Sequence, residues 1–387
     1  MWVLLYVPTG IASIFLIVAV LGGLRYLLHK PLLEIDYISQ LNEMSRAERG
    51  VGQGEFGRDV RESVFAIVDR IEQIQAEAKS TVHSDAEVDH LRRYGLDGGY
   101  PFSFTLDGAE NHSVQRYLEL LDEQLISRHV REIANNPDMY LDVSTSSFRP
   151  LSLRDRPRSV LSEVRRLVRH ESGRAYQQAI EGNPDRMFEH LGTAFQLAEM
   201  VGSCPGIKHG IVALGCRSDI LESIRRTAID GNLPSHEITR LREWLGSISE
   251  PDRLRILEGE RLVARNDLQD RLLFESDEWD ADTRRAFRFM VNQKKANSAI
   301  DRIFERVSEL AFDGLHGQEA EEFKAELREG LPLFSGLFFE LYIPSALACI
   351  RFCDRSTTDI AGTQLLLLIE IFEHDRGELA ASLDQLV

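Results

Sequence analysis

Residues 1–24 read MWVLLYVPTGIASIFLIVAVLGGL and contain no Asp, Glu, Lys, Arg or His. At helical rise, this length spans the roughly 30 Å hydrocarbon core of a bilayer. Trp2 and Tyr6 lie at one end and Tyr26 at the other, and amphipathic aromatic residues favour the two membrane interfaces. The stretch predicts a single transmembrane anchor at residues 1–30, with residues 1–28 as the part that contacts the lipid bilayer.

Two other interpretations of this stretch were weighed. A cleaved secretory signal fits poorly, because a basic leading region and a small-residue cleavage site are missing and the apolar part is long. A buried helix of a water-soluble core stays open as the second alternative. Arg25 and Lys30 flank the carboxyl-terminal end, which favours a single-pass protein of the cell membrane with a cytoplasmic body. Two charges leave the side of the membrane open.

Composition describes the rest of the chain as an ordinary folded protein. The 387 residues are 28% charged and 43% hydrophobic, which is typical of a globular chain rather than a disordered one. The net charge of −17 argues against nucleic acid or anionic lipid as the main partner of the body, because both would repel it. We therefore expect another protein as the partner, and no nucleic acid.

Hydrophobic periodicity predicts an all-α fold. Residues 31–136 form a predicted juxtamembrane helical region, with a helix over 32–49, a second along an apolar stripe from Val60 to Ala78, and a third over about 113–135. The stripe of the third helix is Val114, Tyr117, Leu118, Leu121 and Leu125. Pro137 ends it, and residues 137–157 are the predicted linker.

Residues 157–387 form the predicted helical-hairpin domain. Gly, Asn and Pro clusters at 182–185, 202–206, 231–235 and 249–251 predict short turns between helices. Short loops favour antiparallel neighbours, so we expect stacked helical hairpins with irregular, solenoid-like packing.

Two later segments complete the helical pattern. A further stripe runs from Ile300 to Leu310. The apolar segment 331–350 is either a buried helix or a second membrane span, and Glu340 favours the buried helix because a carboxylate at mid-bilayer is costly.

No catalytic, cofactor or metal signature rises above background. Residues 52–57 match the G-x-G-x-x-G spacing, but the preceding residues are helix-like where the fingerprint requires a strand, so we interpret them as a hinge. The pairs at 170–171, 236–237 and 374–375 combine His with an acid, and we expect them on the surface. Cysteines 204, 216, 349 and 353 lack metal-binding spacing and are expected to be buried thiols, with a disulfide open if the body is extracytoplasmic.

One basic segment stands out on this acidic chain. Residues 149–174 hold eight arginines against three acids. They form either a patch for an acidic partner, phosphate or acidic lipid, or a set of side chains that neutralise the protein's own carboxylates. The candidate residues of the patch are Arg154, Arg156, Arg158, Arg165, Arg166 and Arg169.

The carboxyl-terminal residues 368–387 read LIEIFEHDRGELAASLDQLV. They resemble a segment of uncharacterised bacterial membrane-anchored helical proteins, in which E-H-G-x-Y-P-x-S-L-D-x-L-V is usual. Leu379 and Ala380 stand where Tyr-Pro is usual, and the Asp-Pro-Phe tail of that group is missing. The resemblance implies an anchored helical body and brings no known activity, cofactor or site residue.

These observations favour a membrane-anchored interaction or scaffold protein. Two alternatives stay open: a hydrolase-like enzyme whose site is assembled only in three dimensions, and a component of secretion or pilus assembly. True pilins carry a Glu in the apolar helix and end in a β-sheet, neither of which the sequence predicts.

Overall fold

The computed structural model describes residues 35–49, 58–80, 112–136, 139–141, 159–231, 233–273, 293–313 and 333–380, with a few isolated positions. The predicted anchor, the G-x-G-x-x-G segment and most of the 137–157 linker lie outside these ranges. Within them, no helix combines the length and apolar character that crossing a membrane requires. The anchor therefore stays a prediction.

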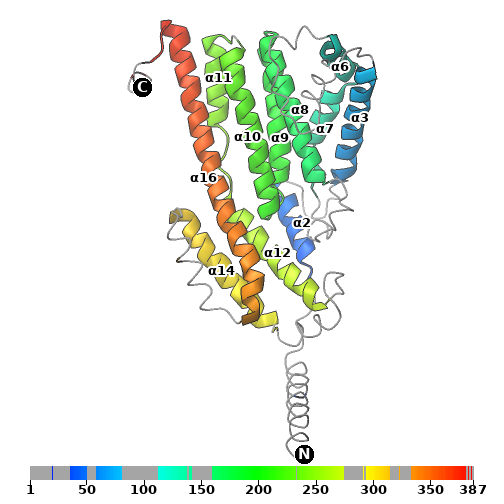
Figure 1. Cartoon of the computed structure of the whole chain (residues 1–387), viewed down its shortest axis with the longest axis vertical. Helices are drawn as coiled ribbons and strands as arrows, with labels where there is room; N and C mark the ends of the chain where they lie inside the picture. The colour runs from blue at the N-terminus through cyan, green and yellow to red at the C-terminus, as the bar shows by residue number, and fades with distance from the viewer. Residues whose placement is uncertain are drawn as a thin grey trace, which may run out of the picture. The chain divides into compact units, whose positions relative to one another are not determined.

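The all-α prediction is confirmed for the described residues (Figure 1). A two-residue parallel pair joins β1 (Arg58–Asp59) to β2 (Met139–Tyr140), with Arg58 opposite Met139. The helices are α2 (Tyr37–Glu48), α3 (Arg61–Ser80), α6 (His112–Glu123), α7 (Ile126–Asn135), α8 (Val160–Ile180), α9 (Pro184–Gly202), α10 (Ile207–Asp230), α11 (Ser235–Gly246), α12 (Arg253–Leu273), α14 (Gln293–Asp313) and α16 (Leu333–Arg376).

Each of the four predicted turns separates two helices, from α8 through α12. Gly182 and Gly206 have φ of 74° and 106°, a region that residues with a Cβ rarely adopt, and Pro184 opens α9. The short turns make α8, α9 and α10 antiparallel neighbours (Figure 1). Because α10 packs against α8 as well as α9, these three helices form a bundle rather than a linear stack.

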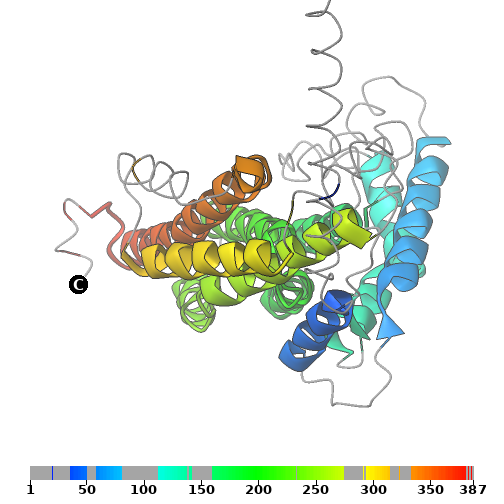
Figure 2. The same ribbon diagram turned by 90° about the horizontal axis from the view of Figure 1, so that it is seen from below.

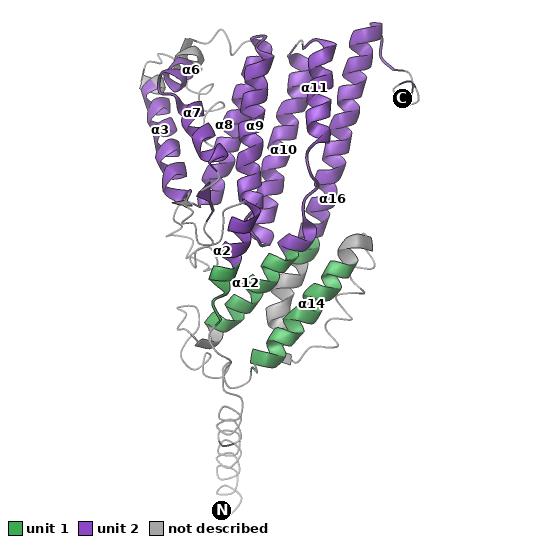
Figure 3. Ribbon diagram, turned by 180° about the vertical axis from the view of Figure 1, so that it is seen from behind, with its two compact units in different colours: residues 1–40, 257–348 green, residues 41–256, 349–387 purple. Residues whose placement is uncertain are grey.

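The chain divides into two compact units, shown in Figure 3. Unit 1 comprises residues 1–40 and 257–348, and unit 2 comprises residues 41–256 and 349–387. Both sides of the predicted 137–157 linker therefore fall in unit 2. In unit 1, the Gln269 amide exchanges two hydrogen bonds with the backbone of Ile35, at 3.0 and 2.8 Å. The stripe predicted on α14 is buried at Ile300, Ile303, Phe304 and Val307.

In unit 2, α3 packs against α6, α7 and α8, and α7 packs against α9. Figure 2 shows α3 beside α6 and α7 when the molecule is viewed from below. The predicted stripe of α3 is confirmed as core, because all its described members are buried: Val60, Val64, Ile67, Val68, Ile71 and Ile74.

The predicted single helix over 113–135 is wrong. The chain forms α6 and α7 instead, and Leu125 between them has a left-handed φ of 54°. The buried positions Leu121 and Ile126 are five residues apart, which a continuous helix would place on different faces. The break brings Ile126 back to the buried side. It also leaves Leu125 50% exposed, outside the predicted buried stripe.

The segment 331–350 belongs to α16, which continues to Arg376. The preference for a buried helix over a second span is supported where side chains are described, because Ala346, Leu347, Cys349 and Ile350 are all buried. This buried stretch joins the part of α16 in unit 1 to the part in unit 2.

Leu125→Gly should stabilise unit 2. A left-handed conformation costs a residue with a Cβ about 1–2 kcal/mol, and part of the gain is offset by the greater freedom of glycine in the unfolded chain. We expect a net gain of about 0.5–1 kcal/mol in the free energy of unfolding, measured by urea denaturation. Leu125→Ala keeps the strain, so a gain of the same size in this control would contradict the explanation.

Candidate functional site

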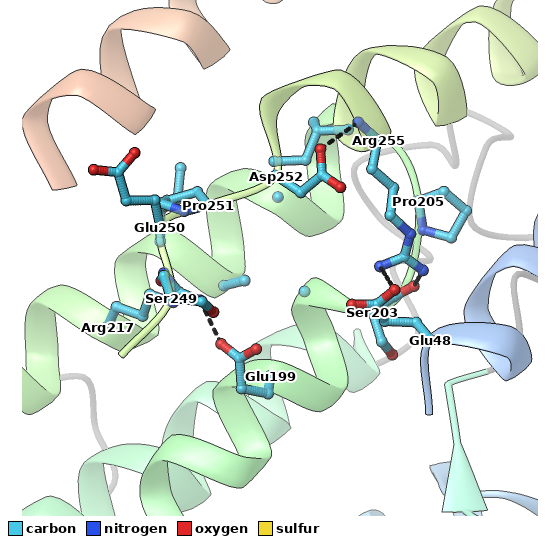
Figure 4. A pocket seen from close by; sticks show the side chains of 15 residues that line it. Glu48, Glu199, Ser203, Pro205, Arg217, Ser249, Glu250, Pro251, Asp252 and Arg255 are labelled. Carbon is cyan, nitrogen blue, oxygen red and sulfur yellow. Dashed lines mark hydrogen bonds and ion pairs between the residues drawn. The ribbon is translucent and has the colours of Figure 1, made fainter. Parts of the chain in front are cut away.

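One pocket of about 270 Å³ lies in unit 2, where the end of α9, the start of α10 and the turn between α11 and α12 meet (Figure 4). Its lining includes the apolar side chains of Ala213, Leu214 and Ile256. Two arginines and four carboxylates also line it: Arg217, Arg255, Glu48, Glu199, Glu250 and Asp252.

Arg217 is held on three sides. Its Nη2 lies 2.5 Å from Glu199 Oε1, and its Nη1 donates to the carbonyl oxygen of Ser249 at 2.9 Å. The guanidinium carbon also lies 5.6 Å from the ring centroid of Phe195, within the range of a cation–π contact. Arg217 therefore ties α10 to α9 and to the turn before α12, and both of its Nη atoms are hydrogen-bonded within the chain.

Arg255 is bound in the same way. Its Nη2 donates to the carbonyl oxygens of Met44, at 2.8 Å, and of Ser203, and its Nη1 lies 3.3 Å from Glu48 Oε2. Asp252 Oδ1 accepts the backbone N–H of Arg255 at 2.9 Å, which satisfies one of the free donors at the start of α12. Both cations of the pocket thus stabilise its walls.

The four carboxylates are the bases among the described side chains that line the pocket. Neither His nor Cys lines the pocket. The hydroxyl of Ser203 donates to the carbonyl oxygen of Met200 at 2.8 Å, so it is not directed at a base. Covalent catalysis needs a nucleophile within hydrogen-bond reach of a general base.

A buried cluster of ionisable side chains lies elsewhere, between α8 and α9. His190 Nδ1 is 2.7 Å from Glu171 Oε2, and His170 Nε2 is 3.8 Å from Glu171 Oε1. All three side chains are buried. The prediction of a surface pair at 170–171 is therefore wrong, and it is also wrong for Glu237, which is buried. His236, His374 and Asp375 are exposed as predicted.

Burial and the contacts between its members set the pKa values in this cluster. It lowers the pKa of His170 to about 4, against a smaller opposing effect of the neighbouring Glu171 charge. Burial alone would raise the pKa of Glu171, but the hydrogen bond and charge of His190 and the charge of His170 lower it below the usual value. Glu171 is thus an ionised carboxylate inside the bundle, stabilised by His190 as a buried charge requires.

Three of the six predicted patch arginines are described, and all three bind the chain's own carboxylates. Arg165 and Arg169 both donate to Asp219 Oδ2 on α10, at 2.9 and 3.0 Å. Arg166 lies between Glu163, at 2.8 Å, and Glu72 on α3, at 3.0 Å. These contacts fit the second interpretation of the segment. Arg154, Arg156 and Arg158 lie outside the described residues.

The cysteines are free and buried, as predicted. Burial raises the pKa of the Cys216 thiol to about 12, so it is an unreactive core residue. The described residues include no group of three or more His, Cys, Asp or Glu side chains placed to hold a metal ion.

Sequence patterns alone missed the His170–Glu171–His190 cluster and the pocket. Glu171 and His190 are 19 residues apart on separate helices, and the pocket gathers residues from Glu48 to Ile256. One signal was present in α8, where Glu171 lies at the spacing of a single apolar stripe: Val160, Leu161, Val164, Leu167, Val168 and Ala175. A carboxylate in an apolar stripe is buried with it and needs a partner inside the fold.

Acidification should destabilise the protein through His170. Because its pKa is lower in the folded state than the ordinary 6.5, the unfolded chain binds more protons between pH 6.5 and 4. The effect of His170 on stability is absent above pH 6.5. The free energy of unfolding then falls by about 3 kcal/mol in total as the pH falls toward 4. His170→Gln should flatten the curve of unfolding free energy against pH, while His236→Gln, at a position 76% exposed, should leave its slope unchanged.

Asp219→Ala should destabilise unit 2 by about 2–3 kcal/mol, because it leaves Arg165 and Arg169 without their shared carboxylate in a partly buried site. The matched control is Asp185→Ala, which removes an ion pair to Arg240 from a side chain that is 89% exposed. Equal losses in the two variants, measured by chemical denaturation, would refute a structural role for the α8–α10 contact.

Comparison with protein-family models, with curated proteins and with solved structures finds no match for this chain. The resemblance of residues 368–387 to membrane-anchored helical proteins therefore stays a prediction.

Proposed function

We propose that this chain is a membrane-anchored helical scaffold, in which residues 1–30 hold a helical body at the bilayer and the body binds another protein. The observation that carries the proposal is the uncharged stretch 1–24 ahead of an all-α body. Arg25 and Lys30 favour a cytoplasmic body.

The arrangement of polar groups supports binding over catalysis. An acid–base enzyme needs groups of shifted pKa that face a cavity. In the described part of the chain, the strongly shifted histidines, His170 and His209, do not line the pocket, and the arginines of the pocket are bound by backbone and carboxylates. The hydrolase-like alternative lacks this convergence, and no described feature favours the secretion-component alternative.

Membrane partition tests the anchor. Full-length protein should stay with the membrane pellet after carbonate extraction. Leu16→Asp combined with Val18→Asp should move it largely to the aqueous fraction, because each aspartate costs about 2.5–3.5 kcal/mol at the centre of a spanning helix. Leu16→Ile combined with Val18→Ile is the matched apolar control. Recovery of the unaltered protein in the aqueous fraction would refute the anchor.

The interaction role needs a separate measurement. Cross-linking in intact membranes, followed by affinity capture of the full chain, should return the same partner in repeated preparations. A single-pass membrane protein of unrelated sequence, tagged identically, serves as the control. Repeated capture of nothing beyond this background would refute the scaffold role even if the anchor holds.

A further inference from the structure

The part of α16 in unit 2 has one packed face. Cys353, Ser356, Thr363 and Leu367 are buried and recur at helical spacing. Arg225 Nη1 on α10 donates to Thr363 Oγ1 at 3.0 Å, and Arg253 on α12 lies 2.7 Å from Asp354. These contacts fix which side of α16 is turned toward the rest of unit 2.

The opposite side of the helix, called here the outer face, carries a second regular stripe. Its positions alternate in steps of four and three, so they follow one side of the helix, and three of the seven are large apolar residues. All are exposed except Ile369 and Phe372, which are half-buried. Figures 1 and 3, viewed from opposite sides, place α16 at the edge of unit 2. The outer face consists of Arg351, Arg355, Thr358, Gly362, Leu365, Ile369 and Phe372.

Gly362 lies at the middle of the outer face. A Cβ at this position would meet nothing within 4 Å, so packing inside the chain does not require glycine here. Glycine weakens a helix relative to alanine, and it is used where another backbone approaches closely. With Thr358 and Ala361 beside it, Gly362 leaves a flat place on which a second helix can cross.

One pair of opposite charges on α16 lies symmetrically about Gly362. Arg351 lies eleven residues before it and Glu373 eleven residues after it, and both are exposed. In an antiparallel pair of α16 helices that cross at Gly362, Arg351 would therefore face Glu373. A parallel pair would place like charges together.

We propose that the outer face of α16 is a self-association surface, on which a second copy of this chain packs antiparallel about a two-fold axis at Gly362. An interface of this kind uses the same patch on both subunits, so each favourable contact occurs twice. The inference names one partner for the scaffold role and rests on that proposed function.

A charge exchange tests the pairing. The purified full chain in detergent micelles should form dimers in sedimentation velocity experiments. Arg351→Glu and Glu373→Arg should each weaken the dimer about tenfold, since each creates two like-charge contacts. The double variant should restore the original dissociation constant. A monomer at every concentration, or a double variant weaker than both single variants, would overturn the proposal.

Engineered cysteines test the orientation. Under mild oxidation, Gly362→Cys should give a cross-linked dimer, because this position faces its own copy. Arg351→Cys should not, because an antiparallel pair separates the two copies of residue 351 by roughly 33 Å at helical rise. Unaltered protein controls for the four buried native cysteines. Cross-linking of both variants would indicate a parallel contact, and cross-linking of neither would indicate another occupant of the face.

These outcomes are separable from failure of the scaffold role. A monomeric protein that stays with membranes and still captures a partner would overturn the self-association surface alone. A dimer with the predicted symmetry that captures no other protein would leave the α16 contact intact and refute the wider role.

Discussion

Buried charge is the constraint on which the α8–α9–α10 bundle depends. Glu171 is ionised inside it, and Asp219 has only 6% of its side chain exposed. A carboxylate removed from water needs a cation or strong hydrogen-bond donors, because its desolvation free energy otherwise exceeds the stabilisation that packing provides. His190 on α9 and Arg165 on α8 supply these contacts. Sliding α9 or α10 by one turn along α8 would leave a charge without its partner, so the ionic contacts fix a register that apolar packing alone leaves less defined.

The helical architecture could be predicted because its signals are local. Gly182 and Pro184 enforce a turn through their own backbone chemistry, and the stripe from Val60 to Ile74 marks one face by spacing alone. The break at Leu125 was missed because the residues up to Leu121 keep the spacing of one helical face. Ile126 lies five residues after Leu121, so it belongs to the buried face of a second helix. This change of spacing is visible in the sequence, but a break there requires Leu125 to adopt a strained left-handed conformation.

The ionic contacts could not be predicted because they are not local. Arg165 and Asp219 are 54 residues apart, and neither segment contains a pattern that identifies the other as its partner. An arginine-rich helix in an acidic protein has the same sequence signature whether it meets a partner or its own carboxylates. The fold decides between these, since α8 lies between α3 and α10 and both offer carboxylates within 3.0 Å of its arginines. The best candidate for an external contact therefore moves from the arginines of α8 to a helix at the edge of unit 2.

Catalysis and recognition make opposite demands on titratable groups. A catalytic acid or base must meet substrate, so the burial that shifts its pKa has to stop at the wall of a cavity. In the described chain, His170 is fully buried and does not face a cavity, and its neighbour Glu171 is hydrogen-bonded to His190. Such groups stabilise a rigid body at neutral pH and have no access to a reactant. A rigid body is what a binding surface needs, because residues fixed before contact lose little conformational entropy on association. The rigid interior of unit 2 is therefore a suitable support for a helix that presents a regular face at its edge.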